Sequence, residues 1–237
     1  MSVSGLALCL RRISSEAKEL CDKAEAREMI PYPWSGLEDS LREAGESHLR
    51  LVGYGSLVNA ESASATIAEA SANQAAPVIA HGVRRIFNYE MDPSLSRYLS
   101  PDNPRARALL NAECGEIGIT ALNGVLLEIR LDDLPALRER EADYDLAPVV
   151  CEPWGGGNGE ASLAWVLVCS PVPGTGPARV NNELIPNPDY YRVCREGAAS
   201  FGEDFLDAWL ESTFLGDGRT SMREWEAADS TGRRSYL

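Results

Sequence analysis

The stretch Leu49–Leu57, with the sequence LRLVGYGSL, sets the expected architecture of the chain. Its first residues, up to Tyr54, have the apolar composition of a buried strand, and Gly55-Ser56-Leu57 follow at once. Asn59 is a suitable N-cap for a helix that extends to about Ala72. The chain therefore turns directly from a buried strand into a helix at this point.

The remaining strands and helices alternate irregularly along the 237 residues. The absence of a regular strand–helix–strand series argues against a Rossmann fold or a TIM barrel. The pattern predicts an α+β protein whose mixed or antiparallel sheet can close into a small barrel. Strands are expected over 77–89, 107–112, 124–130, 149–154 and 163–169, and helices over 134–143, from Asn187-Pro188 onward and over 203–214.

The chain divides into three parts by composition. Residues 1–47 are charged and helix-like and form an N-terminal extension, with helices expected from Ser14 to about Met29 and from Leu37 to Ala44. The domain proper is expected over 48–215, and residues 216–237 are a polar tail that we expect to be irregular. Two long loops rich in proline, 91–106 and 171–188, are expected to shape the pocket and thereby to set substrate choice.

Composition restricts the possible partners. A net charge of −14 disfavours nucleic acid and anionic membrane surfaces. No stretch has the length or apolarity of a signal peptide or a membrane span. The six cysteines lack metal-ligand spacing and there are only two histidines, so we expect no metal site but buried thiols in a reducing, cytoplasmic setting. The oligomeric state is left open.

The turn at Gly53–Leu57 is the first candidate functional element. Glycines allow close approach of a ligand to main-chain N–H groups, and successive N–H groups form a concavity that binds anions. A carboxylate or a developing oxyanion would suit this turn. The alternative is a purely structural connection between strand and helix.

Glu141 is the second candidate. It lies four positions after Leu137 and seven after Leu134, so at helical spacing the three side chains share one face. If the leucines are buried, Glu141 is buried with them, and burial raises a carboxyl pKa towards the range of an acid–base catalyst. The alternative is a structural ion pair with Arg84 or Arg85.

Four short motifs occur in a specific order: Tyr54–Leu57, then Gly82–Arg85, then Asn123–Leu126, then Arg140–Tyr144. Together they resemble the γ-glutamylcyclotransferase-like superfamily over roughly Leu49 to Val168. The resemblance implies a small mixed β-barrel with flanking helices. It also implies an enzyme, a cyclising acyltransferase or lyase, that needs no metal or cofactor.

The resemblance also implies the reaction and the residues that perform it. The enzyme would release 5-oxoproline from a small γ-glutamyl amine or γ-glutamyl amino acid, with Glu141 as general acid and base. Tyr54, Gly55, Ser56 and Leu57 would hold the γ-glutamyl end, and Tyr144 would line the pocket. Ala142 departs from the glycine that many members carry after this glutamate, which leaves the subfamily open.

Other chemistries have weaker support in the sequence. Ser56 with His81 could suggest a hydrolase, but Ser56 does not lie in a Gly-x-Ser-x-Gly elbow. The glycine run 155–159 predicts a hairpin turn and lacks the features of a phosphate-binding loop. Two alternatives remain: a non-catalytic ligand-binding or interaction module on the same scaffold, and an enzyme of specialised metabolism that removes a γ-glutamyl protecting group. We interpret the aromatics Tyr190, Tyr191, Phe201, Phe205 and Trp209 as core residues.

Overall fold

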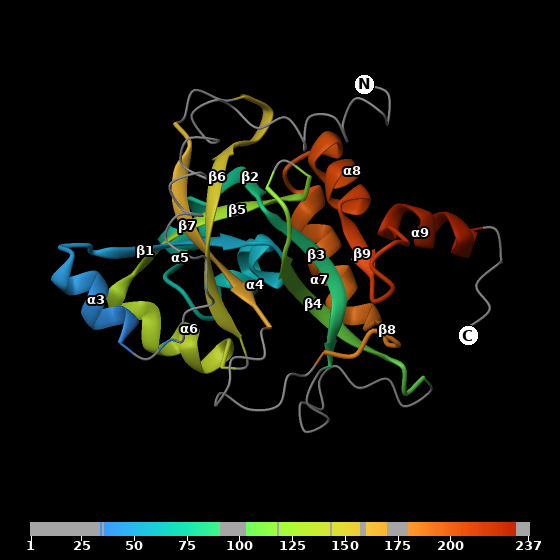
Figure 1. Cartoon of the computed structure of the whole chain (residues 1–237), viewed down its shortest axis with the longest axis horizontal. Helices are drawn as coiled ribbons and strands as arrows, with labels where there is room; N and C mark the ends of the chain where they lie inside the picture. The colour runs from blue at the N-terminus through green and yellow to red at the C-terminus, as the bar shows by residue number, and fades with distance from the viewer. Residues whose placement is uncertain are drawn as a thin grey trace.

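A closed, five-stranded barrel forms one half of the fold (Figure 1). The computed structural model describes residues 34, 36–90, 103–117, 119–142, 144–156, 160–169 and 180–230. In spatial order the barrel strands are β1 (His48–Gly53), β5 (Ala121–Arg130), β2 (Ala76–His81), β6 (Asp145–Pro153) and β7 (Ser162–Val168). Neighbouring strands are antiparallel except β1 and β7, whose parallel pairing closes the barrel. The predicted mixed barrel is therefore confirmed.

The barrel is stabilised by a continuous apolar core, because its strands consist largely of aliphatic residues. Leu49 and Leu51 of β1, Leu127 and Ile129 of β5, and Val166 of β7 are fully buried. Burying each such side chain contributes about 1.5–3 kcal/mol of transfer free energy. β1 ends at Gly53, directly before the turn that begins with Tyr54, so a well-packed core fixes the position of that turn.

A second sheet packs beside the barrel in the order β8 (Ile185–Pro186), β4 (Ala106–Cys114), β3 (Val83–Glu90) and β9 (Thr213–Leu215). The prediction of one strand over 77–89 is wrong, because Gly82 adopts a φ of +77° and separates β2 from β3. Only glycine adopts this conformation at low cost. The chain thereby leaves the barrel at His81 and enters the second sheet at Val83.

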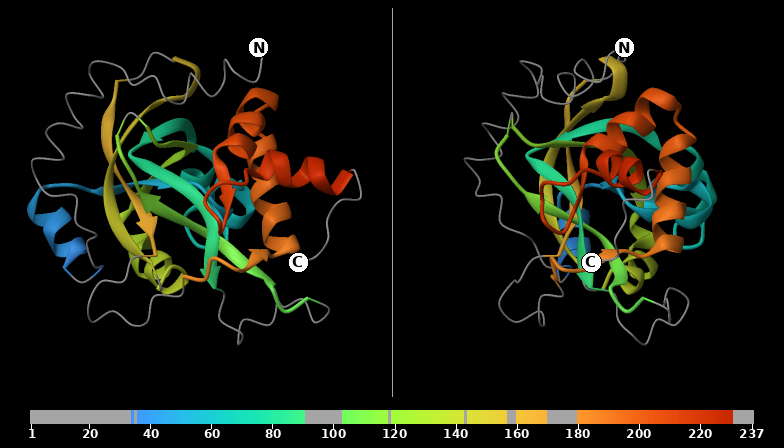
Figure 2. Two further views of the ribbon diagram at one scale, coloured as in Figure 1. Left: turned by 45° about the vertical axis from the view of Figure 1, so that its right-hand side comes forward. Right: turned by 90° about the vertical axis from the view of Figure 1, so that its right-hand side faces the viewer.

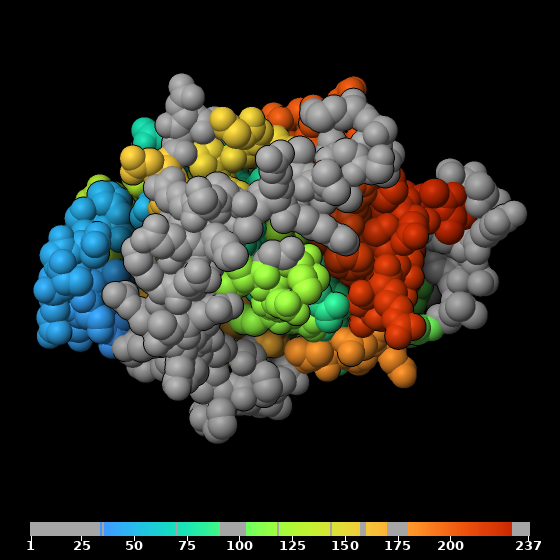
Figure 3. All heavy atoms as spheres, turned by 45° about the horizontal axis from the view of Figure 1, so that its top comes forward, coloured from blue at the N-terminus to red at the C-terminus, as the bar shows by residue number. Residues whose placement is uncertain are grey.

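Helices flank the two sheets on different sides (Figures 1 and 2). In the space-filling view the blue N-terminal part of the described chain and the red C-terminal helices lie at opposite ends (Figure 3). The N-cap predictions at Asn59 and Asn187 are confirmed, since their side chains accept from the N–H groups of Ser62 and Tyr190. The α-helices are α3 (Leu37–Glu43), α4 (Ala60–Ser64), α5 (Glu69–Asn73), α6 (Leu134–Arg140), α7 (Pro188–Ala199), α8 (Glu203–Glu211) and α9 (Met222–Ser230).

Several predicted boundaries are wrong. The helix expected after Asn59 is broken into α4 and α5, and the helix expected over 203–214 ends at Glu211, where the chain enters β9. The tail expected to be irregular contains α9, whose first residue, Met222, is fully buried. A buried apolar contact thus orders a segment of mostly polar composition. Residues 1–33 and most of the two predicted loops lie outside the described residues.

Two further expectations concern thiols and membranes. Cys151, Cys169 and Cys194 are buried, as expected, but Cys114 at the end of β4 is exposed. Cys9 and Cys21 lie outside the described residues. Within the described part of the chain, none of the helices combines the length and the apolarity that crossing a membrane requires.

Candidate active site

The turn after β1 brings backbone N–H groups to the end of the barrel. The 3₁₀ helix η1 (Ser56–Val58) follows Gly55, and its first hydrogen bond runs from Val58 N–H to Gly55 O at 3.0 Å. The N–H groups of Ser56 and Leu57 precede this bond and have no partner within the helix. They are therefore available to a ligand carbonyl or carboxylate.

Glycines on both sides allow the tight packing around this turn. A Cβ on Gly124 of β5 would lie 2.6 Å from Gly53 O, and a Cβ on Gly55 would lie 2.6 Å from the Tyr190 hydroxyl. Real Cβ atoms do not approach other atoms so closely, so both positions need the small residue. This explains the role of glycine in two of the four sequence motifs.

Arg85 supports the turn through hydrogen bonds. Its guanidinium is fully buried and donates to Tyr54 O at 3.2 Å and to both backbone and side-chain oxygens of Asn123 at 2.6 and 3.0 Å. It also contacts Trp209, whose ring centroid lies 4.7 Å from Arg85 Cζ. Burial lowers the pKa of Arg85 to about 9, so the side chain stays cationic at neutral pH. The buried guanidinium is satisfied by neutral acceptors, and its hydrogen bond to Tyr54 O fixes the backbone at the start of the turn.

Glu141 lies one residue beyond the end of α6. Its N–H donates to Leu137 O at 2.9 Å and its carbonyl accepts from Tyr144 N–H at 2.9 Å. Leu134 and Leu137 are buried, as the spacing predicts, and the Glu141 side chain is only 13% exposed. The buried face predicted for this glutamate is therefore present.

Arg140 is the ion-pair partner of Glu141, at 3.0 Å between Nε and Oε1. The alternative partners named from the sequence are wrong, because Arg84 pairs with Glu113 and Arg85 supports the turn. The remaining N–H groups of Arg140 donate to Ser56 Oγ at 2.9 Å and to three oxygens of Ser62 and Thr66. Arg140 therefore links the carboxylate to the turn and to α4.

The surroundings of Glu141 are apolar and hydroxyl-rich. Burial raises the pKa of the Glu141 carboxyl, and the Arg140 guanidinium opposes part of that rise. Tyr54 and Tyr144 donate their hydroxyls to Leu167 O and Leu110 O, each at 2.8 Å. Burial raises the pKa of both phenols well above the usual value, so they remain neutral hydrogen-bonding groups. A carboxyl with a raised pKa is suited to exchange protons near neutral pH.

All six residues predicted for the site line a single pocket: Tyr54, Gly55, Ser56, Leu57, Glu141 and Tyr144. The pocket has a volume of about 30 Å³. Tyr190, Leu110 and Leu167 complete the lining together with residues of β1. The structure thus brings the predicted residues together, while their catalytic roles stay predictions.

Sequence reasoning missed two contributors to this site. Arg140 carries no periodic signal, since it is one of several charged residues in a row. Tyr190 was assigned to the core, and it does pack edge-on against Phe87, but its hydroxyl also borders Gly55. The one available signal was its position in the first turn of a helix capped by Asn187.

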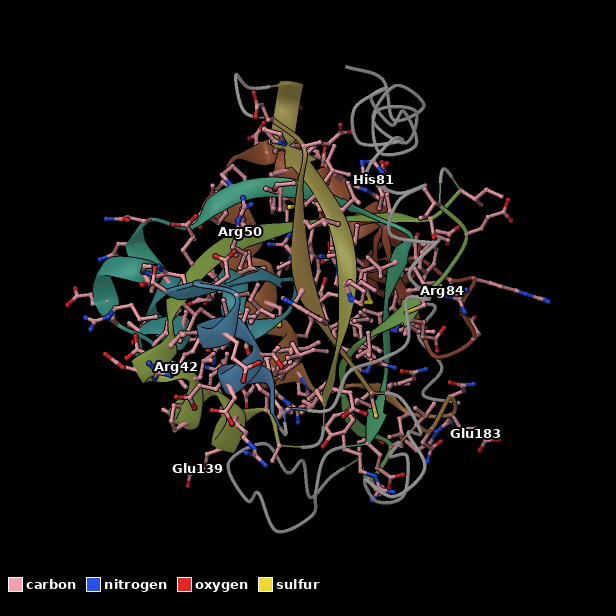
Figure 4. All side chains as sticks on the ribbon, turned by 60° about the vertical axis from the view of Figure 1, so that its left-hand side comes forward. Arg42, Arg50, His81, Arg84, Glu139 and Glu183 are labelled. Atoms are coloured by element: carbon pink, nitrogen blue, oxygen red, sulfur yellow. The ribbon has the colours of Figure 1, made fainter. Side chains whose placement is uncertain are left out.

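The competing chemistries find no geometric support among the described residues. Ser56 Oγ accepts from Arg140, whereas His81 pairs with Glu152 at 2.9 Å on the barrel wall (Figure 4). The two side chains therefore have separate partners and do not form a hydrolase dyad. Within the described ranges no three His, Cys, Asp or Glu side chains cluster in a way that could hold a metal ion.

Comparisons with known proteins show the fold alone. No protein-family model and no curated protein matches the sequence. Among solved structures, YkqA from Bacillus subtilis matches with a TM-score of 0.50 and 15% identity, over 72% of this chain and 55% of that one. An uncharacterized human protein, loc79017, matches with a TM-score of 0.49 and 14% identity, over 78% of this chain and 99% of that one. The chain thus spans about half the length of YkqA.

Proposed function

We propose that the protein is a γ-glutamylcyclotransferase-type enzyme that releases 5-oxoproline from a γ-glutamyl amine or γ-glutamyl amino acid. The observation that carries the proposal is the position of Glu141. A buried carboxyl with a raised pKa faces the same small pocket as the Tyr54–Leu57 turn. This pairing of a proton-transfer group with unpartnered N–H groups is what intramolecular aminolysis requires.

In the proposed reaction the substrate supplies its own nucleophile. Its α-amine attacks its γ-carbonyl carbon, a new C–N bond closes the five-membered ring, and the bond to the leaving amine then breaks. Holding the substrate in a folded conformation supplies much of the rate acceleration, because the nucleophile is already tethered to the carbonyl. The enzyme has to move only protons and to stabilise charge.

Glu141 performs both proton transfers. Its carboxylate takes a proton from the α-ammonium group, which frees the amine to attack, and the resulting acid gives that proton to the leaving nitrogen. The ring nitrogen then loses its second proton as the lactam forms, and the released amine takes up a proton to leave as an ammonium ion. The ion pair with Arg140 favours the ionised form of Glu141, while burial makes it a stronger base than an exposed glutamate. The N–H groups of Ser56 and Leu57 are placed to receive the oxyanion or the α-carboxylate.

The pocket is smaller than the substrate proposed for it. A volume of about 30 Å³ holds roughly two water molecules. A γ-glutamyl group is larger, so we expect lining side chains to move when substrate binds.

The experiment is a substrate panel analysed by mass spectrometry. The full chain is incubated with γ-glutamyl amino acids, γ-glutamyl amines and glutathione, and 5-oxoproline is quantified. Formation of 5-oxoproline supports the proposal, and the best substrate names the leaving amine. Absence of product across the panel, with ligand-dependent increases in melting temperature, would instead favour a non-catalytic binding module.

A further inference from the structure

A broad cleft lies between α3 and α6, apart from the Glu141 pocket. Its volume is about 720 Å³, within the range of roughly 300–1,000 Å³ typical of small-molecule sites. The lining residues of the two cavities do not overlap: Glu141 and Tyr144 face the pocket, whereas Ala142 and Asp145 face the cleft. The described lining consists of Trp34, Gly36, Leu37, Glu38, Asp39, Leu134, Pro135, Arg138, Glu139, Ala142 and Asp145.

Asp145 is the decisive residue of the cleft. It is the first residue of β6 and is 7% exposed. Within the described chain its carboxyl has neither a hydrogen-bond donor nor an ion-pair partner, and burial raises its pKa. Burying a carboxylate without a partner is costly, so a cation that enters the cleft would compensate that cost.

Further carboxylates lie at the rim of the cleft. Glu38 is paired with Arg42 at 2.8 Å, but Asp39 and Glu139 have no ion-pair partner in the described part of the chain. Glu139 points outward from α6 in Figure 4. Arg138 is the one cation among the described lining residues, and it pairs with none of these acids. The rim therefore keeps a net negative charge around a deeper carboxyl.

The walls between these charges are apolar. Leu37 of α3 and Leu134 and Pro135 of α6 line the cleft, and Trp34 adds an indole ring whose Nε1 donates to Tyr144 O at 2.7 Å. That hydrogen bond fixes the ring, and the face of a tryptophan attracts cations. Aliphatic walls between separated carboxylates suit a methylene chain with an ammonium group at each end.

We propose that this cleft binds a small aliphatic diamine or polyamine, with one ammonium group at Asp145 and another at the rim carboxylates Asp39 and Glu139. The proposal is independent of the reaction proposed above, because it depends on a separate cavity. An organic cation fits better than a metal ion, since the described carboxylates do not cluster as metal ligands do.

The test is isothermal titration calorimetry of the full chain with 1,5-diaminopentane, beside 1,5-pentanediol, which has the same length without charge. We expect saturable 1:1 binding of the diamine and none of the diol. Asp145→Asn should weaken the diamine at least about tenfold. Asp204→Asn, the same chemical change at an exposed position of α8, should leave the affinity unchanged.

Thermal melting separates loss of the site from loss of the fold. Asp145→Asn removes an unpartnered buried charge, so we expect it to melt no lower than the wild type. Failure of the diamine to bind, equal binding of the diol, or unchanged affinity in a folded Asp145→Asn variant would each overturn the proposal.

Discussion

Two buried carboxyls, Glu141 and Asp145, lie four residues apart and have opposite surroundings. Glu141 has an arginine at 3.0 Å, and that arginine is tied in turn to Ser56, Ser62 and Thr66. Asp145 has no such partner within the described chain. Burial raises the pKa of both, so burial alone does not distinguish a proposed catalyst from a proposed cation site.

The cavities around these two carboxyls also differ, both in volume and in how their walls are held. The Glu141 pocket is small, with a volume of about 30 Å³, and its walls are held by hydrogen bonds from Arg85 and two tyrosines. The Asp145 cleft has a volume of about 720 Å³ and a lining divided between apolar and charged residues. The lesson is that preorganised partners indicate a site for chemistry, whereas an unpartnered charge in an open cleft indicates a site for a ligand.

Removal of Arg85 should damage the preorganised region most. Arg85→Met removes the guanidinium donor from the buried oxygens of Tyr54, Asn123 and Trp209. We expect the free energy of unfolding, measured in urea, to fall by about 3–5 kcal/mol. Arg84→Met is the matched control at the neighbouring position. The Arg84 side chain is 39% exposed, so its removal should lower the free energy of unfolding by about 1 kcal/mol or less. Equal effects of the two substitutions would contradict the account.

Arg140→Gln makes the surroundings of Glu141 more like those of Asp145. Arg140 lowers the pKa of Glu141, so its removal raises that pKa further. The acid limb of kcat/KM, where Glu141 must be ionised, should move to higher pH, and kcat/KM at pH 7 should fall about tenfold or more. Arg130→Gln, at an exposed arginine, should leave the pH profile unchanged. An acid limb that does not move in Arg140→Gln would remove Arg140 from its positioning role.

Gly55→Ala tests how tightly the pocket is packed. The added Cβ would lie 2.6 Å from the Tyr190 hydroxyl, and Tyr190 is held by Phe87. We expect a loss of about 1–3 kcal/mol in stability by thermal melting. Tyr190→Phe removes the clashing oxygen, so the double variant should recover at least half of the loss. Simple additivity of the two substitutions would show that the clash is absorbed elsewhere.

Asp145→Asn should have the smallest and opposite effect. The folded-state pKa of Asp145 is raised above 3.8, so the free energy of unfolding falls as pH rises from about 3.8 through the folded value. At pH values above the folded pKa the deficit is fully present, and there Asp145→Asn should raise the stability by up to about 1 kcal/mol. The gain should vanish below pH 3.8. A less stable variant at pH 7 would reveal a favourable partner for Asp145.

The sequence predicts the parts of this site that have a local signal. The buried strand before Tyr54 and the alignment of Glu141 with Leu134 and Leu137 follow from apolar spacing, and the structure contains both. The N-caps at Asn59 and Asn187 follow from side-chain chemistry at helix starts. The barrel itself was expected from the order of short motifs, since no local pattern specifies which strands pair.

Contacts between distant segments escaped prediction. Arg140 meets Ser56 across 84 positions, and Arg85 meets Trp209 across 124. Nothing in the composition of either neighbourhood marks Arg85 as buried or Arg140 as a partner of the turn. The break at Gly82 was missed for a different reason, because apolar residues continue on both sides of it and only the positive φ separates the strands. The tertiary fold, and not the local sequence, therefore determines which groups each charged side chain contacts.

The most direct test of the central claim compares 5-oxoproline formation by the wild type, Glu141→Gln and Glu128→Gln. Glu128→Gln is the matched control, because it makes the same chemical change at a side chain of the barrel that is 67% exposed. On the best substrate of the panel, with folding checked by thermal melting, we predict that Glu141→Gln loses at least about 100-fold in rate and that Glu128→Gln matches the wild type. A folded Glu141→Gln variant that forms 5-oxoproline at the wild-type rate would contradict the assignment of Glu141 as the acid and base.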